Sequence, residues 1–116
     1  MPSPIKSQIS IDTLIQIDVR VGTILSVGDV PGADTLVQMR VSFGDHERTI
    51  LAGMKQERDD PKDIEGRQAL FVVNLEPRRM RGLVSEGMLF DIGFADGVRP
   101  VLAVPEAPVP DGTRAG

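Results

Sequence analysis

The chain has 116 residues, a formal net charge of −4 and no cysteine. This length fits a single compact domain, and the absence of cysteine excludes disulfides and thiolate metal sites. Residues 1–8 contain no long apolar run, so we expect neither a secretory signal nor a membrane span, and we expect a cytoplasmic protein. We further expect residues 1–8 to be flexible and residues 9–116 to form one domain.

The first elements expected along the chain are a short helix and a strand. Residues 10–18 (SIDTLIQID) begin with a serine that can cap a helix, and apolar residues recur behind it at helical spacing. Residues 19–27 (VRVGTILSV) are rich in β-branched side chains, which favour a strand, and Gly22 within them indicates a bulge or a bend.

Two further strands are predicted before the middle of the chain. Residues 36–43 alternate between apolar and polar side chains, and a turn at residues 44–47 connects them to a short strand at residues 48–54. The alternation predicts that one face of the first of these strands points into the core. The residues of that face are Val37, Met39, Val41 and Phe43.

The second half predicts one helical turn and three strands. Asp60 and Pro61 form a helix start, and Gly66 ends the turn. Residues 69–75 are apolar on both faces, which is typical of a central buried strand. Residues 88–94 and 98–104 form the last two predicted strands, the latter at an edge because it contains Pro100. We expect the phenylalanines of these strands, Phe90 and Phe94, to be buried in the core, with exposure of either one as the alternative.

Closely spaced strands with a single helical turn between the third and the fourth favour a small all-β barrel. This order predicts the OB-fold, a five-stranded Greek-key barrel, extended by an N-terminal helix and a C-terminal segment.

The sequence offers no good candidate for catalysis. His46 is the only histidine and lies in the turn at residues 44–47, and Ser85 in GLVSEG misses the spacing of a nucleophile elbow. The chain has no glycine-rich phosphate loop, and its acidic residues lack the spacing of a calcium loop. We therefore expect no cofactor, no metal and no enzymatic activity.

Residues 74–88 (NLEPRRMRGLVSEGM) contain the most informative cluster, which is Arg78, Arg79 and Arg81. Guanidinium groups this close repel one another, and their planar forks suit phosphate oxygens. The cluster therefore favours an anionic partner such as a nucleic-acid backbone, with a solvated basic loop as the alternative. The acidic net charge does not exclude this, because charges farther away than roughly 8 Å are largely screened at physiological salt.

Aromatic residues make up only 3% of the chain, with no tryptophan or tyrosine. Proteins that grip single strands usually stack bases on exposed aromatic side chains. The sequence therefore favours contacts with the phosphates and sugars of structured RNA. Asn74, Lys55, Arg58 and Arg20 are further candidates for such contacts, although each also has a structural alternative, such as a pairing of Arg20 with Asp18.

The strings IDVRVGTI, PGADTL, RTILAGM, VVNLEPRRMRGLVSEGM and PVPDGT occur in the order found in tRNA-binding domains, and the chain resembles this family from about residue 9 to residue 113. That family includes the C-terminal domain of methionyl-tRNA synthetases, stand-alone dimeric tRNA-binding proteins and CsaA-type secretion chaperones. The resemblance implies an OB-fold, a homodimer and binding of folded tRNA without sequence specificity. By match to the family motif, the site residues are Asn74, Arg78, Arg79, Arg81, Ser85 and Met88.

Three hypotheses follow for the partner. The leading one is a homodimer that binds tRNA. The second is a chaperone or export factor that holds unfolded polypeptide in an apolar groove near Met80, Leu83, Val84 and Met88. The third is an accessory subunit of an aminoacyl-tRNA synthetase.

Overall fold

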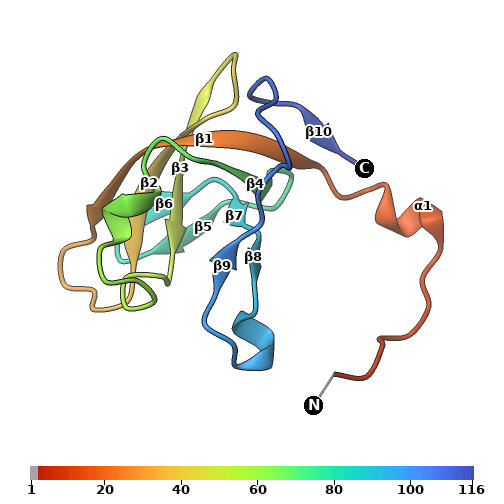
Figure 1. Ribbon diagram of the computed structural model, residues 1–116, viewed down its shortest axis with the longest axis horizontal. Coiled ribbons are helices and arrows are strands. Elements are labelled where there is room, and N and C mark those ends of the chain that lie inside the picture. Colours follow the sequence, from red (N-terminus) through yellow and green to blue (C-terminus); the bar gives the residue numbers. More distant parts are fainter. Residues whose placement is uncertain (1–2) are drawn as a thin grey trace.

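The computed structural model describes residues 3–116 and consists mainly of β-strands (Figure 1). The helical elements are the α-helix α1 (Ile11–Leu14) and the 3-10 helices η1 (Pro61–Ile64) and η2 (Phe94–Asp96). The strands are β1 (Val19–Asp29), β2 (Val37–Ser42), β3 (Glu47–Ala52), β4 (Gln68–Val72), β5 (Arg78–Met80), β6 (Leu83–Ser85), β7 (Met88–Leu89), β8 (Asp91–Ile92), β9 (Val101–Leu102) and β10 (Arg114–Ala115).

The main sheet is antiparallel, with the strand order β3-β2-β1-β4-β7 and with β10 beside β1. The long strand β1 serves both halves of the sheet, because it pairs with β4 through residues 19–23 and with β2 through residues 23–29. The register shifts between Ile24 and Ser26, and such an irregularity increases the local twist. The sheet curls into a half-barrel with β1 arching across it (Figure 1), which confirms the predicted OB-fold.

The two edges of the curled sheet meet through residues 85 and 86. The backbone N–H of Glu86 donates to the carbonyl of Thr49 at 2.9 Å, and a carboxylate oxygen of Glu86 accepts from the N–H of Thr49 at 3.0 Å. The N–H of Leu51 donates to Ser85 Oγ at 3.0 Å. These bonds satisfy backbone groups of β3 that would otherwise form an open sheet edge.

The core confirms the alternation predicted for β2. All four inward residues of residues 36–43 are buried, together with Phe71 of β4. Gly22 serves close packing here, because a Cβ at this position would lie 2.7 Å from Val41 Cγ1. The bulge expected at Gly22 lies instead between Ile24 and Ser26.

Both predicted helix starts are confirmed. The Ser10 side chain accepts a hydrogen bond from the N–H of Thr13, and the Asp60 side chain accepts one from the N–H of Lys62. The short α1 buries none of its residues, so its apolar stripe faces outward. Within residues 3–116, no helix has the length and apolar character needed to cross a membrane.

The expectation for the last strands is wrong in part. The predicted strand at residues 88–94 divides into β7, which joins the main sheet, and β8, which pairs with β9. Leu89 still belongs to the main sheet and is buried. The chain leaves that sheet after Leu89, and Phe90 and Phe94 beyond this point are 45% and 69% exposed. The burial expected for these two phenylalanines is therefore not observed.

Residues 3–10 precede α1 without regular secondary structure, and Ser3 Oγ donates to an Asp96 carboxylate oxygen of η2 at 2.7 Å. For residues 1–2, the flexibility predicted from the sequence lies outside the described part of the chain.

Candidate nucleic-acid interface

The arginine-rich segment forms a β-hairpin, where the sequence had suggested an irregular loop. Strand β5 pairs with β6 through Arg78 opposite Ser85, Arg79 opposite Val84 and Met80 opposite Leu83. The turn residues Arg81 and Gly82 have φ angles of 51° and 78°, which both lie in the left-handed region. Two consecutive residues of this conformation match the turn that best fits the twist of a two-residue hairpin.

The two faces of the β5–β6 hairpin have different roles. Residues directly opposite each other share a face. Met80 and Leu83 pack against the buried cluster of Val30, Ala33 and Leu51, which anchors one face of the hairpin to the barrel. Arg79 and Val84 occupy the opposite face and are exposed, and Arg81 lies at the tip.

The three arginines of the hairpin are exposed and carry their charge without an internal partner. Within residues 3–116, no carboxylate lies within ion-pair distance of Arg78, Arg79 or Arg81. The neighbouring Glu86 is turned toward the backbone of Thr49. A fixed hairpin with unpaired guanidiniums is suited to bind oxyanions, because the backbone that carries the charges is already in place and no internal ion pair has to be broken.

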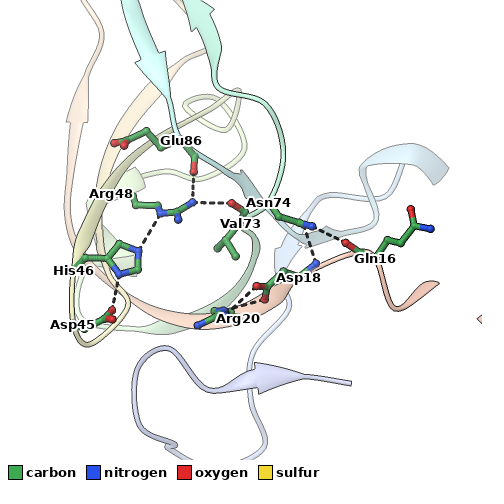
Figure 2. Close-up of polar contacts among 9 residues, drawn as sticks. All are labelled: Gln16, Asp18, Arg20, Asp45, His46, Arg48, Val73, Asn74 and Glu86. Atoms are coloured by element: carbon green, nitrogen blue, oxygen red, sulfur yellow. Dashed lines mark hydrogen bonds and ion pairs between the residues drawn. The ribbon is translucent and has the colours of Figure 1, made fainter. Parts of the chain in front are cut away.

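Asn74 holds the segment that precedes β1. Its Oδ1 accepts from the N–H of Asp18 at 2.8 Å, and its Nδ2 donates to the carbonyl of Gln16 at 2.6 Å (Figure 2). Both ends of the amide are therefore engaged within the protein. This is the structural role that the sequence analysis had left open for this residue.

Ser85 and Met88 differ in accessibility. Ser85 is 3% exposed, and its Oγ accepts from Leu51 and donates to the carbonyl of Gly87 at 3.0 Å. Ser85 therefore holds the backbone around the hairpin in place and is too buried to contact a ligand. Met88, in β7, is 44% exposed and presents part of its side chain to solvent.

The remaining basic candidates lie outside the hairpin. Arg20 forms two hydrogen bonds with the Asp18 carboxylate, at 2.9 and 3.0 Å, and this contact lowers the pKa of Asp18 (Figure 2). Lys55 Nζ lies 3.5 Å from an Asp29 carboxylate oxygen. Arg58 lines a cleft beside β9. The structure thus groups Arg20 with Asn74 at one end of β1 and does not bring Lys55 or Arg58 into the hairpin.

Arg48 was missed by the sequence analysis. Its Nη1 donates to the carbonyls of Val73 and Glu86 at 2.7 and 3.0 Å, and its Nε donates to His46 Nε2 at 3.1 Å (Figure 2). Because arginine can only donate, His46 carries its proton on Nδ1, which contacts Asp45 at 2.6 Å. The only signal in the sequence was an arginine at the start of an apolar strand. Arg48 fixes the loops at both ends of the arginine-rich segment.

Comparison with known proteins decides the family. The model of the "Putative tRNA binding domain" family matches residues 19–114. The chain belongs to this family. The match contains β1, the whole arginine hairpin and the first residue of β10, so it covers the barrel and the candidate site together.

Relatives with this domain include longer enzymes. The chain is 40% identical over 111 residues to the methionine–tRNA ligase of Parabacteroides distasonis, and 38% identical over 112 residues to that of Nitrosomonas europaea. These matches cover 96% and 97% of the chain but only 16% of either ligase. The chain therefore corresponds to a small part of those enzymes.

Solved structures match the chain along nearly its full length. A MetRS-related protein from Pyrococcus horikoshii has a TM-score of 0.87 at 29% identity, and the match covers 96% of this chain and 100% of that one. The chaperone CsaA of Bacillus anthracis has a TM-score of 0.82 at 25% identity, with 95% and 100% covered.

Proposed function

We propose that this tRNA-binding domain binds the folded body of tRNA without catalysis and without sequence specificity, through Arg78, Arg79 and Arg81. The observation that carries the proposal is a set of three exposed, unpaired guanidiniums on one anchored hairpin, with Arg79 on its outer face, Arg81 at its tip and Arg78 at the start of β5. Phosphate contacts supply affinity without reading bases. Because such a protein acts where tRNA is found, we also propose a cytoplasmic location.

The experiment is a titration with tRNA at several salt concentrations. Each phosphate contact that is lost should reduce the slope of log affinity against log salt by about one. We expect Arg79→Gln and Arg81→Gln to show this reduction. Arg40→Gln is the matched control, because Arg40 is also an exposed strand arginine but pairs with Glu47 at 3.1 Å. Unchanged affinity and slope in both hairpin variants, with folding intact, would show that RNA binds elsewhere or not at all.

We also propose a homodimer. The segment around α1 stands away from the barrel, and the β8–β9 hairpin with η2 extends beneath the sheet (Figure 1). Both elements expose large apolar side chains, and such surface on a small protein usually marks an interface. The residues concerned are Ile9, Ile11, Leu14, Ile15, Ile92, Phe94 and Val98. In a dimer, two arginine hairpins can contact one tRNA, which raises avidity if the geometry allows both to engage.

The dimer is tested by measuring the molar mass in solution. Phe94→Asp should shift the protein to the monomer, whereas Leu25→Asp, at an exposed apolar position of β1, should not. If the unmodified chain is a monomer at micromolar concentration, this part of the proposal fails and the single-site RNA proposal stands on its own.

A second candidate function is the capture of unfolded polypeptide, favoured by the likeness to the chaperone CsaA. The sequence suggested an apolar groove lined by four residues near the hairpin. Met80 and Leu83 pack against the barrel instead, so only Val84 and Met88 expose apolar surface there. Salt separates the two functions: RNA binding should weaken steeply as salt rises, and apolar peptide binding should not. Association with a synthetase is a further proposal, motivated by the ligase relatives.

A further inference from the structure

A second group of arginines lies apart from the hairpin and borders a concave site. Arg58, Arg67 and Arg99 line a cleft of about 310 Å³, together with Glu57 and the apolar residue Leu102 of β9. This volume lies at the lower end of the range of small-molecule sites. The three arginines come from three separate parts of the chain, so the fold brings them together.

The positive charge of this cleft is not neutralised inside the protein. Within residues 3–116, none of the three arginines forms an ion pair with a carboxylate. Arg99 Nε donates a hydrogen bond to the backbone carbonyl of Glu57 at 2.8 Å. The two terminal nitrogens of the Arg99 guanidinium stay available for a ligand. Glu57 is the only acidic residue in the lining, and burial, followed by repulsion from Asp91, raises its pKa.

We propose that this cleft binds a phosphate monoester carried on a small organic body. Three guanidiniums opposed by one carboxylate match the dianion of a monoester, which carries a charge of about −1.5 to −2 at pH 7, better than the single charge of a backbone phosphodiester. A monoester also offers three terminal oxygens, whereas a carboxylate offers two.

The walls of the cleft provide a place for the organic part. Pro100, Val101 and Leu102 form an apolar side. A second cleft of about 370 Å³, which contains Glu106, shares Arg67 and Val104 with the first, so the two lie next to each other. The first cleft, at about 310 Å³, itself has room for a body larger than the phosphate group.

The test is calorimetric titration of the full chain with adenosine 5′-monophosphate, with adenosine and inorganic phosphate as comparison ligands. We expect the monophosphate to bind, inorganic phosphate to bind more weakly and adenosine not to bind. Arg58→Gln and Arg67→Gln should each weaken binding by about tenfold or more, since each removes a charge-assisted contact. Glu57→Gln should strengthen binding. Arg40→Gln is the control and should leave it unchanged, because Arg40 is exposed, pairs with Glu47 and lines neither site.

The monoester could belong to an RNA terminus or to a small metabolite. A second experiment distinguishes the two by comparing tRNA that carries a 5′-phosphate with the same tRNA after dephosphorylation. A loss of affinity on dephosphorylation, abolished by Arg67→Gln, assigns the cleft to an RNA terminus. Binding of the free monophosphate with no such loss assigns it to a small metabolite. If neither ligand depends on Arg58 or Arg67, the proposal is overturned. The hairpin titration has its own variants, so failure of this site leaves the RNA proposal untouched.

Discussion

The backbone N–H of Leu51 in β3 donates to the Ser85 hydroxyl at the end of β6, at 3.0 Å, and both residues are buried. Through this bond the arginine hairpin is fixed to the barrel edge. Ser85→Ala would leave the Leu51 amide without a partner in a dry environment, so we expect a loss of about 1–3 kcal/mol in the free energy of unfolding. Chemical denaturation measures it. Ser26→Ala, at an exposed position of β1, is the control and should change little.

Gly22 and Gly28 lie on the same strand and form a matched pair. A methyl group at Gly22 would meet Val41 Cγ1 at 2.7 Å and Phe43 Cε1 at 2.9 Å, whereas one at Gly28 would meet nothing within 4 Å. Gly22→Ala should therefore cost about 1–3 kcal/mol by overpacking. Gly28→Ala should be neutral or slightly stabilising. Equal midpoints of urea denaturation for the two variants would contradict the packing described for β1.

Asn74→Ala tests whether this residue positions the chain or contacts RNA. Because its amide bonds to both Gln16 and Asp18, its loss should accelerate hydrogen exchange at the Asp18 amide. The salt slope of tRNA binding should stay unchanged, since no phosphate contact is removed. Unaltered exchange together with a reduced slope would instead make Asn74 a direct RNA contact.

The contact between Arg20 and Asp18 predicts a pH effect. Hydrogen bonding to Arg20 lowers the pKa of Asp18 below its ordinary value of 3.8. The pair therefore contributes stability above pH 3.8, and this contribution is lost as the pH falls through the lower pKa of the folded state. Arg20→Gln should be less stable than the unmodified chain at neutral pH, and the difference should shrink below pH 3.8. A difference that is constant with pH would show that the pair contributes nothing.

The core-facing residues of the barrel could be predicted from the sequence, because the alternation of apolar and polar side chains is visible within one strand. The alternation through Val37, Met39, Val41 and Phe43 can be read without knowledge of the partner strands, and all four are buried. The pairing of Arg20 with Asp18 could also be predicted from the sequence, because residues two apart in an extended chain lie on the same face.

Contacts between residues far apart in the chain could not be predicted from the sequence. Ser85 meets Leu51 across 34 residues, and Arg48 meets Val73 across 25, so no local spacing reveals either contact. The apolar character of Phe90 and Phe94 predicted burial, yet it does not say whether a protein's own core or another surface covers a side chain. The hairpin was mistaken for a loop because strands of three residues are too short to show a period.

The strand β1 begins at Val19, which lies opposite Ala115 in β10, so the points where the chain enters and leaves the barrel are neighbours. The segments that flank the barrel on its two sides therefore start from the same place, and neither has to cross the sheet. Additions before β1 and after β10 thus leave the sheet pairing intact, and the same architecture occurs both as a short region of methionine–tRNA ligases and along the whole length of a much smaller chain.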